Sequence, residues 1–435
     1  MLHKSYCTGK QLAKHVIVIS LDALSETEWH EAKQMPNISH LIEVGSYSYA
    51  LKSVFPTHTY TVHTTMVTGV YPDKHGIMHN HQFQPFVPDG DQTWYWYQRE
   101  IKVPTIYDLA KRYHMTTAGL LWPVTGRSSI TYNFPEIVAI GDENQTLKIL
   151  KNGTLSYLIG LEYRLGKYRK SLEPPIFDDY ITLCASNTIR RKKPNLTLIH
   201  LCDLDHTKHH NRTDGPEVKE SLVRLDKRIG EMIQATKDAG IFNDTAFILL
   251  GDHGQFSIDY GIHLNNLLRD AGLIVENNGH MEWRAYLQTT GGNAFLHIKE
   301  GDQEAARIAI AVLTKAMKED IYGIESIYDR NMLDTLHAHS SIRYVVEGKP
   351  GFQYHDELSD ITIQSYNDMG KKYATHGYSP EKPNYKCILI AAGSNIKKNY
   401  NMGSVEMVDI APTIASILGL EFYPCDGKVL HHIFV

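Results

Sequence analysis

Cysteine is scarce in this sequence, and its five copies are widely separated. Cys7, Cys184, Cys202, Cys387 and Cys425 include no close pair. This spacing excludes a zinc site built from paired cysteines and gives no disulfide framework. We therefore expect reduced thiols, as in a cytosolic protein.

Long hydrophobic runs are also missing. No apolar stretch approaches the ~18 residues that a membrane-spanning helix needs. The apolar run at 15–21 ends at Asp22, and it is not followed by the small-residue cleavage site that a signal peptide has. We therefore expect no transmembrane segment, no signal peptide and a cytoplasmic location.

The chain lacks a strong charge of either sign. Its 44 Lys and Arg residues oppose 49 Asp and Glu residues, which gives a formal net charge of −5. Without a basic stripe, a nucleic-acid polymer is not the expected partner. The 435 residues could form two or three domains of roughly 150 residues each.

Histidine, by contrast, is abundant, with 24 copies in the chain. Imidazole is the commonest metal ligand in proteins and titrates near neutral pH. Composition therefore points towards metal chemistry, and the positions of acidic partners must decide which histidines take part.

Short β-branched runs recur along the chain, each nearly continuous in apolar residues, as expected of parallel strands covered on both faces. They lie at 16–21, 117–122, 196–202, 245–250 and 386–391. Helical periodicity lies between them, at 216–239, 303–317 and 406–419 and in a segment that begins with Pro36. This alternation predicts an α/β fold with a mostly parallel central sheet flanked by helices.

Residues 266–370 show a different pattern. They contain a strand at 293–298, the helix at 303–317 and strand-like runs near 324–328 and 342–346. We interpret this segment as a small α+β cap insertion, so that residues 1–265 together with 371–435 form the main core. The segment 80–104, rich in Trp, Tyr, Gln and Pro, is expected to be a long loop beside the same face.

Three of the predicted strands end in acidic residues. Asp22 follows the first strand, Asp205 closely follows the strand at 196–202, and Asp252 with His253 follows the strand at 245–250. In open α/β sheets, ligands bind beyond the carboxyl ends of the strands. An aspartate at one strand end is commonly only a turn or cap residue, but three at one edge favour a functional site.

Asp205 and His209 are four residues apart, so a helical turn would project both from one face, as two ligands of one metal require. The alternative is a surface pair within the run 206–210. Glycines flank Asp252 and His253, which lets the backbone bend so that the two side chains converge.

The segment from Phe55 to Gly69 begins with a Pro followed by hydroxyl residues, which is typical of a helix start. A Thr at a helix N-terminus lies near unpaired N–H groups and the positive end of the dipole. Thr59 could therefore be a simple N-cap. It could also be an alkoxide nucleophile, which would need a metal to lower the pKa of its hydroxyl.

Together these motifs resemble the alkaline phosphatase superfamily, and within it the nucleotide pyrophosphatase/phosphodiesterase (type I phosphodiesterase) family. The motifs occur in family order over nearly the whole chain. They are Ile19-Ser-Leu-Asp22, Phe55-Pro-Thr-His-Thr59, Thr68-Gly-Val-Tyr-Pro-Asp-Lys-His-Gly76, Asn80, Asp205 with His209 and Gly215-Pro216, Gly251-Asp-His-Gly254, and Ala374-Thr-His-Gly-Tyr378.

The resemblance implies an alkaline-phosphatase-like catalytic core with two zinc ions, or manganese in their place. One ion would be held by Asp205, His209 and His376. The other would be held by Asp22, Asp252, His253 and Thr59. The donors are oxygen and imidazole without thiolate, which independently suits zinc or manganese.

The resemblance also implies a mechanism. Two ions roughly 4 Å apart would clamp the attacking and leaving oxygens of an in-line phosphoryl displacement. Thr59 would attack phosphorus, and water would hydrolyse the resulting phospho-threonine. Asn80 and the backbone N–H of Thr59 would donate to a non-bridging phosphoryl oxygen.

The substrate is expected to be a small nucleotide or another phosphodiester. Where the family commonly has Lys-Thr-Phe, this chain has His58-Thr59-Tyr60, and the role of His58 is open. Tyr60 could stack on a base, Trp122 belongs to a family Trp-Pro motif, and Tyr132 or Phe134 could form a second wall. His58, His63, His75 and His79 are also expected to cluster around the nucleophile.

Other activities compete with this interpretation. A phosphomonoesterase or phosphomutase of the same superfamily would share the metal core. The absence of Arg from 15 to 97 favours a diester, which carries one charge fewer than a monoester. A sulfatase is excluded because its Cys or Ser motif is missing. A non-catalytic metal-binding protein is the alternative from a different class, and the sequence leaves the oligomeric state open.

Overall fold

The computed structural model describes residues 9–435. Within this range nine strands form one sheet in the order β19-β2-β18-β6-β1-β5-β3-β4, with β20 beside β2. The five predicted strands are all present, as β1 (His15–Leu21), β3 (Thr117–Leu120), β5 (Leu196–Leu201), β6 (Thr245–Leu250) and β18 (Cys387–Gly393). The others are β2 (Gly45–Lys52), β4 (Tyr132–Phe134), β19 (Tyr400–Asn401) and β20 (Val405–Glu406).

The sheet is mostly parallel, as predicted. Strands β4, β3, β5, β1 and β6 are parallel neighbours. Only β18 runs against both of its neighbours, β6 and β2. The carboxyl ends of β1, β5 and β6 therefore meet at one edge.

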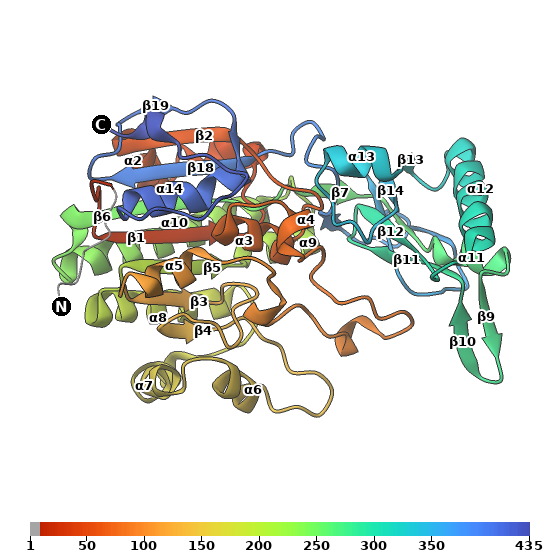
Figure 1. The fold of residues 1–435 in the computed structure, drawn as a ribbon, viewed down its shortest axis with the longest axis horizontal. Helices are drawn as coiled ribbons and strands as arrows, with labels where there is room; N and C mark the ends of the chain where they lie inside the picture. The colour runs from red at the N-terminus through yellow and green to blue at the C-terminus, as the bar shows by residue number, and fades with distance from the viewer. Residues whose placement is uncertain (1–8) are drawn as a thin grey trace.

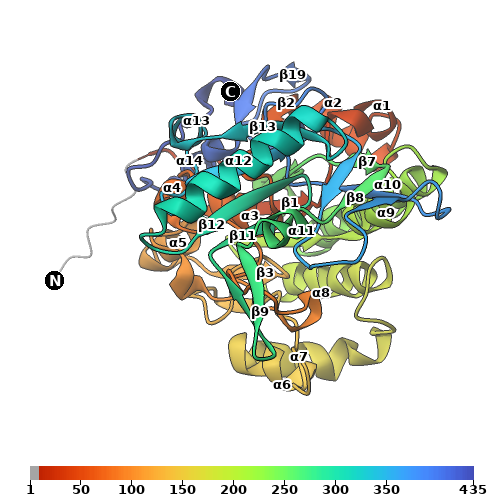
Figure 2. The same ribbon diagram turned by 90° about the vertical axis from the view of Figure 1, so that its right-hand side faces the viewer.

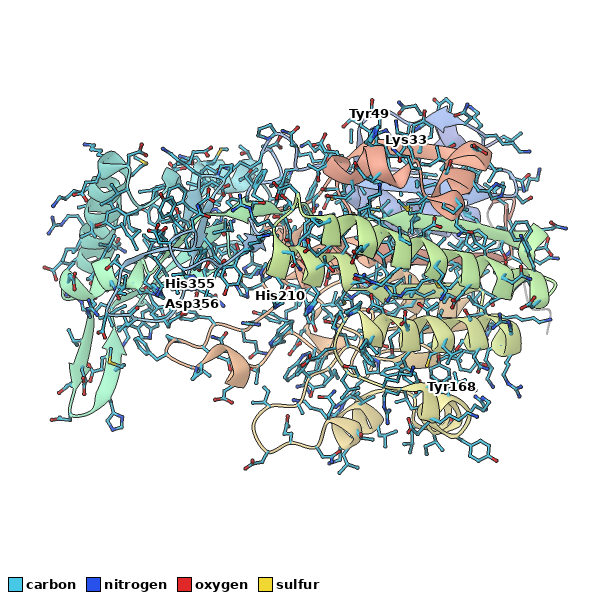
Figure 3. The ribbon with its side chains drawn as sticks, turned by 180° about the vertical axis from the view of Figure 1, so that it is seen from behind. Lys33, Tyr49, Tyr168, His210, His355 and Asp356 are labelled. Carbon is cyan, nitrogen blue, oxygen red and sulfur yellow. The ribbon has the colours of Figure 1, made fainter. Side chains whose placement is uncertain are left out.

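Helices cover both faces of the sheet. Figure 3 shows α2 (Pro36–Val44), α8 (Ile176–Lys192) and α10 (Pro216–Asp238) on one face. Figure 1 shows α3 (Thr59–Thr68), α5 (Ile106–Arg112) and α14 (Ile410–Ile417) on the other. Alternate residues of β1 belong to separate hydrophobic clusters, Ile17 and Ile19 to one and Val16 and Val18 to the other. The central strands are thus buried on both faces, which explains their continuous apolar character.

One predicted helix is shorter than expected. The pattern at 406–419 predicts a single helix, but Val405 and Glu406 pair with β2 and residues 407–409 form a 3-10 turn. Helix α14 begins only at Ile410. The pairing with β2 takes the backbone hydrogen bonds that an earlier helix start would need.

A second, antiparallel sheet lies at one end of the molecule (Figures 1 and 2). Its order is β11 (Ala285–Thr289), β12 (Asn293–Ile298), β14 (Tyr344–Gly348) and β13 (Ile324–Tyr328), and it packs against α12 (Gln303–Glu319). The hairpin of β9 (Ile274–Asn277) and β10 (His280–Trp283) extends beside it. These elements agree with the strands and helix predicted for 266–370.

Strand pairing crosses the predicted start of the cap. β8 (Tyr260–Ile262) precedes residue 266 but pairs with β15 (Phe352–Tyr354) and β16 (Ile363–Ser365). The division into a core and a cap at 266 and 370 stays a prediction. In the described part of the chain, no helix is both long enough and apolar enough to cross a membrane.

The shorter elements are α1 (Trp29–Ala32), α4 (Pro72–His75), α6 (Gln145–Asn152), α7 (Leu155–Leu165), α9 (Asp203–Asn211), α11 (Asn265–Asp270), α13 (Arg330–Thr335), β7 (Phe256–Ile258) and β17 (Tyr373–Thr375). The segment 80–104 contains only short 3-10 turns and isolated bridges. It is therefore the long loop that its composition predicts.

Candidate active site

The three strand-end acids lie together, as their positions predict. Strand β1 is flanked by β5 and β6 in register, with Leu21 opposite Leu201 and Ser20 opposite Leu250. Asp22 and Asp252 leave the sheet from β1 and β6, and both are buried. Asp205 lies in the first turn of α9, which follows β5.

One group of donors forms on α9 and beside β17. Asp205 and His209 share a face of the helix, with 3.3 Å between Asp205 Oδ1 and His209 Nε2. One ligand atom from each of Asp205, His209 and His376 lies within 4.8 Å of the others. His210, the next residue, is exposed at the surface (Figure 3). The structure thus brings Asp205 and His209 together with His376, and their role as metal ligands stays a prediction.

A second group of donors surrounds Nε2 of His253. This nitrogen lies 3.3 Å from Asp22 Oδ1, 3.4 Å from Asp252 Oδ2 and 3.3 Å from Thr59 Oγ1. Ligand atoms of Asp22, Asp205 and His253 are also within 4.8 Å of one another. The two groups are therefore adjacent, as the two-ion arrangement requires.

The three histidines of these groups share one hydrogen-bonding pattern. Nδ1 of His253 bonds to Gly254 O at 3.3 Å, Nδ1 of His209 to Ala374 O at 2.7 Å, and Nδ1 of His376 to Thr57 O at 3.2 Å. A carbonyl oxygen only accepts, so the proton must be on Nδ1. In the neutral imidazole each Nε2 then carries the free lone pair, the arrangement typical of histidines that bind a metal.

Without a cation, the negatively charged carboxylates of the two groups repel one another. Asp22 Oδ1 and Asp252 Oδ2 are buried and have no hydrogen-bond partner in the described structure. Burial, and then the negative charges of Asp252 and Asp205, raise the pKa of Asp22 well above its ordinary value. A divalent cation would remove this repulsion, and the oxygen and imidazole donors suit zinc or manganese.

Thr59 is the first residue of helix α3, and the N-cap position belongs to His58. The structure therefore excludes the simple N-cap interpretation of Thr59. Its backbone N–H has no acceptor within the helix. Asn80 Oδ1 accepts from the backbone N–H of Tyr60 at 2.9 Å, which leaves the Asn80 amide NH₂ for another acceptor.

The predicted substrate contacts need correction. Tyr60 and Trp122 are both fully buried, at 0% exposure, so neither ring face is open to a ligand. Tyr132 pairs with Ala118, which is level with Thr197 and Ile17. Ile17 precedes Asp22 by five residues, or roughly 16 Å along a strand. Tyr132 therefore lies that far back along the sheet from the strand-end site. Its ring packs against the ring of Tyr157, with 5.6 Å between the ring centroids.

The expected histidine cluster around the nucleophile is present in part. His63 Nδ1 donates to Thr59 O at 2.8 Å, and His58 Nδ1 accepts from Asn80 N at 3.0 Å. The rings of His58 and His79 are 4.6 Å apart. His75 instead bonds to Thr65 Oγ1 within the core.

Sequence reasoning missed His200 and Glu136. His200 lies in strand β5, whose other residues are apolar except Thr197, and its Nε2 is 3.0 Å from Asp22 Oδ2. Its Nδ1 is 3.1 Å from Glu136 Oε2. A polar residue within a buried apolar strand is the signal that could have identified it.

Comparisons with known proteins identify the family of this chain. A family model described as type I phosphodiesterase / nucleotide pyrophosphatase matches residues 16–379. The chain is 23% identical to human bis(5'-adenosyl)-triphosphatase ENPP4, over 98% of this chain and 82% of that protein. It is 22% identical to a venom phosphodiesterase of Naja atra, over 90% of this chain and 42% of that protein.

Among solved structures, the chain resembles murine ectonucleotide pyrophosphatase/phosphodiesterase 5, in an inactive threonine-to-alanine variant bound to AMP. The TM-score is 0.70 at 18% identity, over 98% of this chain and 100% of that one. This likeness establishes the alkaline-phosphatase-like fold that the motifs predict.

Proposed function

Because the chain belongs to the type I phosphodiesterase / nucleotide pyrophosphatase family, we propose that it hydrolyses its substrate through a covalent phospho-threonine at Thr59. The family match confirms the predicted family and class of enzyme, a hydrolase of phosphoric diester or pyrophosphate bonds. The observation that carries the proposal is the position of Thr59 Oγ1, 3.3 Å from a histidine nitrogen that also faces two carboxylates.

Two zinc ions, or manganese ions, fit the donors of this site. One would be held by Asp205, His209 and His376, and the other by Asp22, Asp252, His253 and Thr59. When bound, such ions lower the pKa of a coordinated hydroxyl and neutralise charge on a leaving oxygen.

The side chains around Thr59 supply the remaining chemistry. The Oγ1–phosphorus bond forms as the bond from phosphorus to the leaving oxygen breaks, and the proton that Oγ1 gives up to solvent is balanced by the proton that the leaving oxygen takes up. The Asn80 amide and the Thr59 backbone N–H donate to a non-bridging oxygen as its negative charge grows. Water then attacks phosphorus, the Oγ1–phosphorus bond breaks, and the threonine hydroxyl is restored.

A phosphodiester or pyrophosphate of nucleotide type is the proposed substrate. Two relatives support a nucleotide as the substrate. The human relative is a bis(5'-adenosyl)-triphosphatase, and the murine relative was solved in complex with AMP. Lys208 cannot neutralise a doubly charged monoester, because its ammonium is fully buried, 2.8 Å from Glu28 Oε2. Together with the absence of Arg from 15 to 97, this supports a diester over the monoester of a phosphomonoesterase or phosphomutase.

A paired assay tests the proposed function. Purified zinc-loaded protein should hydrolyse a chromogenic nucleoside phosphodiester faster than p-nitrophenyl phosphate, and a chelator should abolish both reactions. Thr59→Ala should remove the activity. Thr68→Ala, on the same helix with its hydroxyl bonded to Thr64 O, should retain it. Faster cleavage of the monoester, or full activity in Thr59→Ala, would contradict the proposal.

A further inference from the structure

His200 bridges two carboxylates inside the sheet. It is 1% exposed, and its two ring nitrogens contact Asp22 Oδ2 at 3.0 Å and Glu136 Oε2 at 3.1 Å. We propose that His200 and Glu136 are positioning residues that orient the Asp22 carboxylate towards its cation. This inference rests on the proposed function of the site, and it assigns roles to two residues that the predicted ligand set does not contain.

The two carboxylates among the proposed ligands of the second ion present their oxygens in the same way. Asp252 Oδ1 accepts from the backbone N–H groups of Ala23 and His253, at 3.0 and 2.9 Å, and its Oδ2 has no hydrogen-bond partner among the described residues. Asp22 Oδ2 is held by His200, and its Oδ1 likewise has no hydrogen-bond partner there. Each carboxylate thus has one oxygen held and one directed into the site. For Asp22 the holding group is a side chain, which mutation can remove.

His200 could instead belong to a third cation site, because Asp22, His200 and Cys202 also offer ligand atoms within 4.8 Å of one another. The geometry argues against this. Cys202 Sγ is 3.7 Å from Nδ1 and 3.8 Å from Nε2 of His200. A sulfur almost equally far from both nitrogens does not lie along the lone pair of either. Both nitrogens face carboxylate oxygens instead, which is the role of an orienting residue.

The contacts continue from His200 to the nucleophile. Glu136 Oε1 accepts from the hydroxyl of Tyr60 at 3.3 Å. The backbone N–H of Tyr60 in turn donates to Asn80 Oδ1 at 2.9 Å. A chain of side-chain contacts therefore joins Asp22 to the residue that follows Thr59. It gives buried Tyr60 a role in holding the site, in place of the base stacking that its sequence position suggests.

Packing fixes the plane of the His200 ring. The ring of His63 lies against the ring of His200, with 4.4 Å between their centroids. The ring of Trp122 in turn lies against His63, with 4.8 Å between those centroids. Trp122 is itself fully buried. The imidazole is therefore confined to the orientation in which its nitrogens meet Asp22 and Glu136.

Zinc affinity, measured by competition with a chromogenic chelator, tests the inference in the full-length protein. His200→Leu should lower the affinity for one of the two zinc ions about 10- to 100-fold, the usual effect of losing such an outer contact. The affinity for the other ion should not change. His200→Gln, whose amide can still donate to Asp22, should recover much of the lost affinity for the affected ion. Glu136→Leu should also lower the affinity for that ion, because it removes the contact that holds His200. This second variant keeps the inference testable if His200→Leu fails to fold.

Cys202→Ala is the matched control, because Cys202 lies against the same ring but holds neither carboxylate by a hydrogen bond in the described structure. Unchanged affinity for both ions in His200→Leu and Glu136→Leu would overturn the inference, as would an equal loss in Cys202→Ala. The inference stands if zinc affinity depends on His200 but the wild-type protein hydrolyses no diester. In that case only the proposed function fails. The reverse result, diesterase activity with zinc affinity independent of His200, removes the inference alone.

Discussion

At the scale of single residues, we propose separate tasks for the two ends of the Asn80 amide. Its oxygen accepts from the backbone N–H of Tyr60 at 2.9 Å, and its NH₂ would donate to a phosphoryl oxygen. We expect Asn80→Ala to lower kcat roughly 10²- to 10³-fold, the usual effect of losing such a donor. Asn80→Asp keeps the oxygen that holds Tyr60 but replaces the donor by a negative charge, so it should be at least as slow.

Steady-state kinetics with the nucleoside diester, at matched zinc content, measure this effect. The exposed Asn401 provides a control, and Asn401→Ala should leave kcat unchanged. If Asn80→Asp retained wild-type kcat, the amide would only hold Tyr60 and would not contribute a donor to the phosphoryl group.

Residue type and strand position were enough to select the three strand-end aspartates as candidates, whereas His376 and the full ligand sets came from the family resemblance. Asp22, Asp205 and Asp252 follow parallel neighbouring strands, so their proximity depends only on the order of strands in the sheet. The aromatic contacts could not be predicted in this way. Whether Tyr60 faces solvent or Glu136 depends on a segment 76 residues away, and no local pattern encodes that contact.

At the scale of elements, a buried ion pair holds α9 against the segment that carries Asp22. Lys208 Nζ lies 2.8 Å from Glu28 Oε2 and donates to Ala23 O at 2.8 Å, with 0% and 3% exposure for the two side chains. Truncating one partner leaves the other charge buried and unpaired. We expect Lys208→Ala to lower the free energy of unfolding by about 3–5 kcal/mol.

Urea unfolding followed by circular dichroism measures this loss. Lys219→Ala, at an exposed position on α10, should change the free energy of unfolding by less than about 0.5 kcal/mol. Combining Lys208→Met with Glu28→Gln removes both charges and should recover part of the stability. An equally small loss in Lys208→Ala and Lys219→Ala would show that the pair does not stabilise α9.

Within the central sheet, the strands with continuous apolar runs were predicted, and strands without such a run, such as β2, were not. Strand β2, GSYSYALK, alternates small and polar residues with tyrosines, so it has no apolar run that marks a buried strand. The reversed direction of β18 could not be predicted either, because hydrophobic periodicity is the same for both directions. The cytoplasmic location stays a prediction.

At the scale of the whole molecule, buried histidines make stability depend on pH. Burial, followed by nearby histidines, lowers the pKa of His75 and of His79 to about 3. Burial lowers the pKa of His297 to about 4. These residues are neutral in the folded protein, and in the unfolded chain they bind protons below about pH 6.5. Unfolding therefore takes up protons, and stability falls as the pH drops from 6.5 towards 4.

His75 shows why the folded protein resists this proton. Its Nδ1 accepts from the backbone N–H of Ile77 at 3.1 Å, so protonation would replace that hydrogen bond with repulsion between two donors.

At pH 5, about 1.5 units below the unfolded value, each such histidine should destabilise the fold by about 2 kcal/mol. Urea unfolding at pH 7 and pH 5, with chelator present to remove metal effects, measures the loss. His75→Gln should reduce it by about 2 kcal/mol, whereas the exposed control His432→Gln should not. A pH dependence of the same size in both variants would show that buried neutral histidines are not its source.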